Sequence, residues 1–344
     1  MGNKLLVAIT TALLLSYGCN NKIIQSKTAV SNTDRLEQRV DSVLKLMTLD
    51  EKIGQMNQYN GFYDVTGPAP QNGDAAKKYD HLKKGLVGSM LNVRGVKEVK
   101  AIQKIAVEQT RLGIPLLFGF DVVHGYKTIS PIPLAEAASW DMEAIRKSAE
   151  IAAAEAAASG LNWTFAPMVD ISRDARWGRV MEGAGEDPYL GSRIAAARVK
   201  GFQGADFSAV TSIAACTKHF AGYGFAEAGR DYNTVDVGMS TLHNVILPPF
   251  KATVDAGVLT FMNSFNELNG TPATGSTYLQ RDILKGEWDF DGFIDCVRRS
   301  AHQVEFCGLF DVDTFESHIA RLLADIESIV VCQVMDRSSD DNSP

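Results

Sequence analysis

The sequence lacks the marks of several common classes of binding protein. Its 344 residues carry a formal net charge of −7, and Lys and Arg are scattered without a basic run, which predicts no surface for nucleic acid. No Gly-x-Gly-x-x-Gly turn follows a predicted strand, so a dinucleotide-binding fold loses its main support. A neutral ligand such as a sugar requires neither feature.

Cysteine is scarce, with five residues in the chain. Cys216 lies in an apolar run, which predicts a core position rather than a chemical role. Cys296, Cys307 and Cys332 crowd into the end of the chain, and their spacing is not that of a metal site. We therefore predict no metal from the cysteines.

No apolar run near the N-terminus is long enough for a permanent membrane-spanning helix, because residues 5–15 are too few. The run follows a charged start and precedes Ser16-Tyr17-Gly18-Cys19, which is the order of a secretory signal over residues 1–19. Cys19 stands where a lipoprotein signal places its acylated cysteine, although Ser16 replaces the usual Leu. We expect export, to the periplasm or to the outer membrane through a lipid at Cys19. The alternatives are plain cleavage and a non-cleaved end.

Polar residues 20–33 suit a tether, and a folded domain is expected to follow. Residues 34–47 have apolar side chains at helical spacing, and Thr48-Leu49-Asp50-Glu51 can cap the next helix. Strands are expected at 85–91, 115–120, 163–167, 214–218 and 259–265, with helices at 96–112, 142–160, 191–203 and 242–256. This alternation predicts a mostly parallel sheet, either doubly wound or closed into a barrel. One α/β barrel of about 250 residues also fits the length.

Polar and aromatic residues follow several of these strands. In a barrel the strand ends open on one face, where a site is built. Asp121 directly follows one strand, although a turn or capping role explains it equally well. Lys218 and His219 end another, and two basic side chains there can donate hydrogen bonds to hydroxyls, whereas a lone histidine there is more often structural. The remaining residues at strand ends are His124, Asp170, Arg173, Arg176, Tyr223, Asn266 and Glu267.

One loop is unusually rich in charge. Residues 173–187 contain three arginines, a tryptophan and several acids. A solvated salt-bridge cluster is one interpretation of such a loop. The other is a grip on a sugar ring, because Trp and Arg together suit that role.

Five successive motifs resemble the signatures of family 3 glycoside hydrolases, especially periplasmic β-glucosidases. They are residues 46–56 (LMTLDEKIGQM), 119–125 (GFDVVHG), 174–179 (DARWGR), 218–220 (KHF) and 266–270 (NELNG). Their order and spacing fit the family. The resemblance covers about Asp34 to Ile294 and implies an N-terminal TIM-type (β/α)8 barrel over residues 34–295.

The resemblance also implies a substrate, a mechanism and a set of binding residues. The expected ligands are β-glucosides or oligosaccharides, and neither a metal nor a cofactor is implied. By motif position, Asp121 would bind the outer hydroxyls of the nonreducing sugar, and Arg179, Lys218 and His219 would hold the neighbouring ones. Phe265 stands where many members have a tyrosine. Hydrolysis in the family proceeds with retention, through a covalent intermediate on an aspartate and a second carboxylic acid.

The sequence of one loop indicates to which branch of the family the chain is most similar. The β-N-acetylglucosaminidases carry Asp-Ser-His after Lys-His-Phe and use that histidine as the acid-base. Here the comparable residues are Asp231-Tyr232-Asn233. The loop histidine is absent, which favours the glucosidase branch.

The resemblance ends at the nucleophile. Family members continue from Gly-Phe into Val-Val-Ser-Asp, and Val297 occupies the position of that aspartate, where it cannot form a glycosyl ester. Asp295 is a weak candidate because it lies two residues early, or about 6.5 Å along a strand. The codons of these residues can be chosen so that the next reading frame encodes Ile-Val-Ser-Asp, which matches the family. A tandem duplication of the four bases ATTG at the Ile294 codon would produce such a change of frame. We therefore interpret residues 296–344 as an unrelated, out-of-frame tail that leaves the barrel incomplete at its C-terminal end.

Three functions remain open from the sequence. The first is a β-glucosidase barrel, a retaining exo-glycosidase of carbohydrate catabolism that is impaired or inactive as this polypeptide. The second is a noncatalytic sugar-binding protein that keeps Asp121, Arg179, Lys218 and His219 as a lectin-like site. The third is a gene fragment that does not fold stably.

Overall fold

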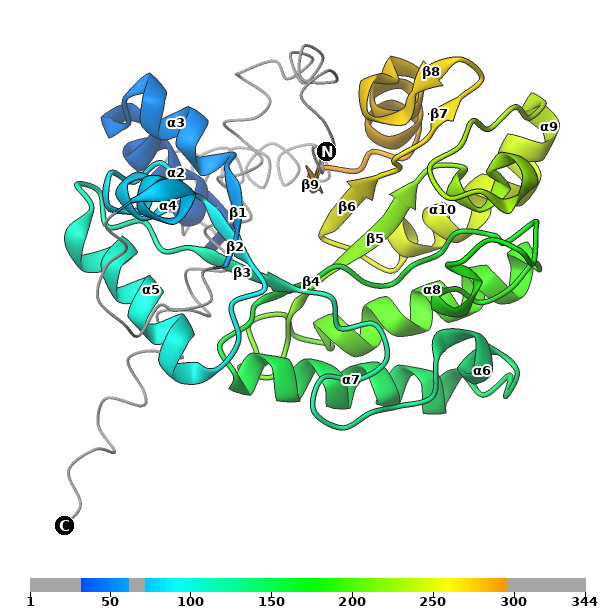
Figure 1. Ribbon diagram of the computed structural model, residues 1–344. Helices are drawn as coiled ribbons and strands as arrows, with labels where there is room; N and C mark the ends of the chain where they lie inside the picture. Colours follow the sequence, from blue (N-terminus) through cyan, green and yellow to red (C-terminus); the bar gives the residue numbers. More distant parts are fainter. Residues whose placement is uncertain (1–31, 62–71, 296–344) are drawn as a thin grey trace, which may run out of the picture. The chain divides into compact units, whose positions relative to one another are not determined.

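The computed structural model describes residues 32–61 and 72–295, and its central feature is a parallel sheet. The strands lie in the order β1 (Gln58–Asn60), β2 (Ser89–Leu91), β3 (Leu117–Phe120), β4 (Trp163–Thr164), β5 (Ala214–Phe220), β6 (Thr260–Asn263) and β9 (Phe293–Asp295). Every neighbouring pair is parallel. Within these described ranges no pairing joins β9 back to β1. The predicted TIM-type barrel fold is confirmed, with seven of its parallel strands within the described residues (Figure 1).

Helices and short turns connect these strands. The α-helices are α2 (Asn32–Leu46), α3 (Leu49–Gln55), α4 (Gly73–Lys83), α5 (Val96–Gln109), α6 (Pro133–Ala137), α7 (Met142–Ala158), α8 (Pro188–Gln203), α9 (Met239–Thr241) and α10 (Leu247–Asp255). The 3-10 turns are η1 (Val180–Glu182), η2 (Tyr223–Phe225), η3 (Glu227–Gly229) and η5 (Ala273–Gly275), and the π-helical segments are η4 (Leu242–Ile246) and η6 (Tyr278–Glu287). A hairpin pairs β7 (Glu267–Leu268) with β8 (Thr271–Pro272). None of the helices in the described part of the chain has the length and hydrophobicity needed to cross a membrane.

Helix starts follow short polar signals in the sequence. Thr48 and Glu51 form the predicted capping box of α3, because the Glu51 carboxylate accepts from the Thr48 amide at 2.8 Å and the Thr48 hydroxyl accepts from the Glu51 amide at 3.3 Å. Asp141 accepts from the first amides of α7, and Asp187 does the same for α8 directly before Pro188. Each side chain satisfies donors that an isolated helix end leaves unpaired.

Two faces of the sheet carry two separate parts of the core. Successive strand residues point to opposite faces, so Ala215 of β5 and Phe261 of β6 pack in the large core cluster that includes helical residues. Ala214 and Cys216 of β5 instead pack with Trp163 inside the barrel. Cys216 is fully buried, which confirms its predicted core position. The same alternation carries Lys218 to the interior side two residues further along β5.

Several elements lie outside the sequence prediction. The strand β1 and the helix α4 were not predicted, and β1 is a polar segment of three residues, two of them partly buried and one exposed. The predicted helix over 242–256 is divided into the π-helical segment η4 and the helix α10. Strand pairing, rather than a local pattern, therefore defines the first strand of the sheet.

Candidate active site

Asp121 stands at the carboxyl end of β3 on a firmly held loop. Gly119, two residues before it, allows Phe165 to pack against the strand, because a Cβ there would lie 2.8 Å from the Phe165 ring. The next amide, that of Val122, donates to the hydroxyl of Thr164 at 3.1 Å. Buried Arg198 donates to the carbonyl of Val123. These contacts fix the backbone on which the Asp121 carboxylate is carried.

Arg198 belongs to a buried ion pair below this loop. It extends from α8, and its guanidinium contacts the Glu136 carboxylate of α6 at 2.5 Å. Both side chains are almost completely buried, so neither charge is solvated if its partner is removed. The ion pair thus links the helices to the loop that carries Asp121.

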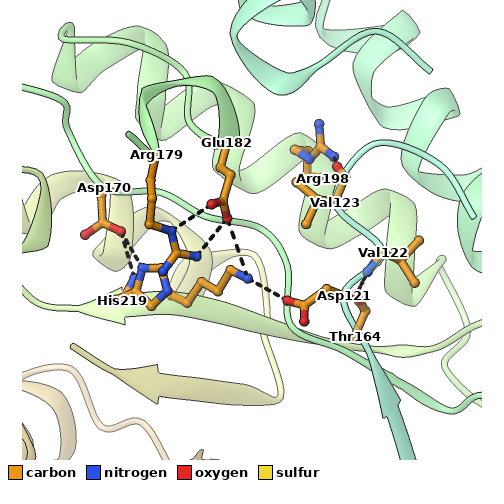
Figure 2. Close-up of polar contacts among 10 residues, drawn as sticks. Asp121, Val122, Val123, Thr164, Asp170, Arg179, Glu182, Arg198 and His219 are labelled. Carbon is orange, nitrogen blue, oxygen red and sulfur yellow. Dashed lines mark hydrogen bonds and ion pairs between the residues drawn. The ribbon is translucent and has the colours of Figure 1, made fainter. Parts of the chain in front are cut away.

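Four charged side chains meet at the mouth of the barrel, and we call Asp121, Arg179, Glu182 and Lys218 the polar cluster. The ammonium of Lys218 donates to the Asp121 carboxylate at 2.8 Å and lies 3.8 Å from the Glu182 carboxylate. Arg179 donates through two nitrogens to Glu182, at 2.7 and 2.9 Å. Figure 2 shows Glu182 between Arg179 and Asp121. The structure therefore brings together three of the five binding residues predicted from the sequence, Asp121, Arg179 and Lys218, in one connected group.

The polar cluster has one accessible end and one enclosed end. The Asp121 side chain is 51% exposed, whereas that of Lys218 is 4% exposed. Burial disfavours a charged Glu182, but the hydrogen bonds from Arg179 and the charge of Lys218 hold its pKa below the usual range. Carboxylates accept hydrogen bonds, and the cations of Lys and Arg donate them. Together they suit hydroxyl groups, which can do both.

Glu182 was not identified from the sequence. It lies in the short turn η1, three residues after Arg179, and that spacing is the only local signal of their pairing. Its position beside Lys218 depends on how the long loop after β4 folds. This side chain connects the two cations of the polar cluster.

His219, the fourth predicted residue, is buried and hydrogen-bonded to Asp170. Its ring Nδ1 lies 2.8 Å from Oδ2 of Asp170, and its backbone amide donates to the same oxygen at 3.1 Å. Burial, together with the charges of Arg179 and Lys218, lowers the pKa of His219 well below its usual value. The imidazole is therefore neutral at neutral pH, so of the two side chains that end β5 only Lys218 carries a positive charge.

An aromatic group borders His219. The ring of Phe265 lies 5.2 Å from the His219 ring, 5.5 Å from that of Tyr223 and 5.6 Å from that of Tyr232. Trp177 contacts Tyr223 but is 2% exposed, and its indole nitrogen donates to Asp231 at 3.0 Å. The ring of Trp177 is therefore a core group, and the part of this loop that is accessible to a sugar must come from other residues. Phe265 is only half-buried, in agreement with a place at the site.

The charged loop after β4 combines both interpretations made from its sequence. Arg176 is exposed and paired with Asp174 at 2.5 Å, which is the salt-bridge interpretation. Arg173 lies over the ring of Phe225. Of the three arginines, Arg179 alone joins the polar cluster. His124, at the end of β3, contacts the Ser130 carbonyl within its own loop instead.

Asp295 ends β9 inside the barrel wall. It is 6% exposed, and its Oδ2 has no hydrogen-bond partner among the described residues. Burial, with a smaller effect from Asp121, raises its pKa to about 7. Val297, at the predicted nucleophile position, and Cys19, the predicted lipidation site, lie outside the described residues, as do Cys296, Cys307 and Cys332. In residues 32–61 and 72–295 no group of three His, Cys, Asp or Glu side chains is placed to hold a metal ion.

A parallel α/β barrel with charged side chains gathered at the carboxyl ends of its strands has the architecture of a barrel enzyme. Residues 48–300 match the model of the glycosyl hydrolase family 3 N terminal domain. The chain belongs to this family. The resemblance found in the five sequence motifs is thereby confirmed.

Relatives with assigned activities agree with this membership. The chain is 44% identical over 253 residues to a periplasmic β-glucosidase of Salmonella typhimurium, a match that covers 74% of this chain and 32% of the relative. The β-glucosidase of Listeria innocua in complex with glucose aligns with a TM-score of 0.76 and 33% identity, over 89% of this chain and 49% of that one. A mutant of the same Listeria enzyme in complex with laminaribiose aligns with a TM-score of 0.75 and 33% identity, over 91% of this chain and 49% of that one. The chain thus spans a third to a half of the length of these relatives.

Proposed function

We propose that this barrel is the sugar-binding part of a β-glucosidase-type hydrolase that releases nonreducing β-D-glucose. The observation that carries the proposal is the connected polar cluster at the mouth of a family 3 barrel. Asp121, Arg179 and Lys218 are its binding residues, with His219 and Phe265 beside them. The expected ligands are β-glucosides or oligosaccharides.

The chemistry of the polar cluster supports this assignment. The exposed Asp121 carboxylate accepts hydrogen bonds from sugar hydroxyls, and the charged partner makes each bond stronger than one between neutral groups. Lys218 is held between two carboxylates, so its ammonium is positioned before a ligand arrives. Phe265 offers an aromatic surface for the apolar face of the sugar. Glucose and laminaribiose occupy the solved relatives named above, which favours a β-linked glucose unit as the ligand here.

Hydrolysis needs groups that sugar binding does not. Retention requires a carboxylate nucleophile about 5 Å from a second carboxylic acid. Position 297, where the resemblance places the nucleophile, holds Val. Asp295 is buried, so water and substrate have little access to its carboxyl. We infer that the 344-residue polypeptide binds the sugar and hydrolyses glycosides poorly or not at all.

The proposed location is outside the cytoplasm. The signal-like residues 1–19 support export, and a relative with 44% identity is named a periplasmic β-glucosidase. Attachment to the outer membrane through a lipid on Cys19 is the more specific form of this proposal. The alternative is a soluble periplasmic protein released by plain cleavage.

Calorimetric titration with glucose tests the binding proposal. We expect saturable binding by the wild type and a loss of about tenfold or more in affinity for Asp121→Asn, because a charged acceptor is replaced by a neutral amide. Asp289→Asn is the matched control, since this exposed aspartate lies in the segment before β9. Equal affinity of the wild type and Asp121→Asn would reject Asp121 as a ligand. An aryl β-glucoside assay run in parallel should give a rate near that of the buffer.

A further inference from the structure

Asp170 and His219 form a buried pair behind the polar cluster. Both side chains are 1% exposed. Oδ2 of Asp170 is shared by two nitrogens of one residue, the backbone amide of His219 at 3.1 Å and its ring Nδ1 at 2.8 Å. In Figure 2, His219 lies next to Asp170, and Asp121 lies on the far side of His219 from Asp170.

The shared oxygen determines where the imidazole carries its proton. A backbone amide can only donate, so Oδ2 acts as an acceptor toward His219. The short contact from Nδ1 to the same oxygen is then a hydrogen bond when Nδ1 carries the proton. In a neutral imidazole the other ring nitrogen, Nε2, is left as an acceptor. The direction of this bond is the same if Asp170 is protonated on Oδ1, because Oδ2 remains the carbonyl oxygen.

The surroundings keep the ring neutral. Arg179 and Lys218 are cations near His219, and both oppose a positive imidazolium. The aromatic rings of Tyr223 and Phe265 pack around it. Two further acids of the site are already paired, since Glu182 is bound to Arg179 and Asp231 to Trp177. Asp170 itself is buried, and its pKa is raised to about 7 by that burial.

We propose that Asp170 is a positioning residue that holds His219 as the Nδ1-protonated tautomer, so that Nε2 accepts a hydrogen bond from a sugar hydroxyl. The second half of this inference rests on the proposed sugar-binding function. Lys218 and Arg179 donate to the sugar, whereas His219 accepts from it. A hydroxyl that bridges these groups donates to Nε2 and accepts from a cation, which fixes its orientation.

Nitrogen NMR of the imidazoles tests the tautomer without any sugar. The full chain would be labelled with ¹⁵N at its six histidines, and the His219 signals assigned by their loss in His219→Gln. We expect a protonated Nδ1 and a bare Nε2 in the wild type. Asp170→Asn should retain this tautomer, because its amide oxygen can replace Oδ2, whereas Asp170→Ala should shift the proton toward Nε2. A wild-type ring protonated on Nε2 overturns the proposal even if Asp170→Ala fails to fold.

Glucose titration of the same variants tests the consequence. Asp170→Ala should bind glucose about tenfold more weakly, and Asp170→Asn within a few-fold of the wild type. Unchanged affinity in a folded Asp170→Ala protein whose tautomer has shifted would overturn the role of Nε2 as a ligand. If the wild type binds no glucose while its tautomer is as expected, the sugar-binding function fails and the positioning by Asp170 stands.

Discussion

The buried carboxyl of Asp295 predicts a pH-dependent gain in stability on its neutralisation. This side chain ends β9 with one oxygen that has no partner among the described residues. The perturbation is Asp295→Asn, which keeps the shape of the side chain and removes its ionisation. Any cost of burying the new amide is independent of pH, so the pH-dependent part of the effect reports the carboxyl alone.

The sign and size follow from the raised pKa. Burial first, and the charge of Asp121 second, raise the pKa of Asp295 from 3.8 to about 7 in the folded chain. The folded state thus holds the proton more tightly than the unfolded state, and ionisation destabilises the fold. This cost is absent below a pH of about 4, grows between about 4 and 7, and is constant above. At about 1.4 kcal/mol per pH unit, it reaches up to about 4 kcal/mol.

Urea unfolding followed by tryptophan fluorescence measures this difference. The free energy of unfolding of Asp295→Asn relative to the wild type should rise between pH about 4 and pH about 7.5. The low pKa of His219 makes the free energy of unfolding fall toward acid pH. This effect is the same in the wild type and in Asp295→Asn, so it cancels in their difference. Asp289→Asn, with its exposed side chain, should show no such rise. A difference that stays constant with pH would refute the argument that Asp295 ionises at a cost.

Three further predictions concern other parts of the chain. Arg198→Met should destabilise the fold by about 3–5 kcal/mol in urea unfolding, because it leaves Glu136 charged and buried; adding Glu136→Gln should restore part of the loss, and a stable single variant would count against the ion pair. Cys19→Ser should abolish lipid labelling and release the protein from membranes, unless the wild type is already soluble after cell breakage. DNA sequencing beyond the Ile294 codon should find Val-Ser-Asp, the rest of the barrel and an acid-bearing second domain in the next frame, whereas early stop codons there would contradict the frame change.

Much of the fold could be predicted because the relevant signals are local or periodic. The alternation of helix and strand predicted a parallel sheet, and the capping residues at Thr48 and Glu51 marked a helix start that the structure retains. Asp121 and Lys218 could be brought together in advance, since parallel strands end at one face of a barrel. The strand β1 could not be found, because three polar residues form a strand only through pairing with β2.

The remaining details of the site depend on burial and on loop conformation. The charge of His219 could not be predicted, because it follows from complete burial between cations and from the Asp170 contact. Trp177 belongs to a loop whose composition suits a grip on a sugar ring, but its side chain has the environment of a core residue. Glu182 joins Arg179 to Lys218 only after the loop following β4 has folded. Such non-local contacts leave no periodic trace in the sequence.

A crystal structure of the 344-residue chain soaked with glucose would show directly whether the polar cluster binds the sugar. We expect glucose at the barrel mouth, with hydroxyl oxygens within hydrogen-bond distance of the Asp121 carboxylate and the Lys218 ammonium. The sugar ring should lie beside Phe265. Glucose bound elsewhere, or a polar cluster that stays empty at concentrations where calorimetry shows saturation, would contradict this expectation.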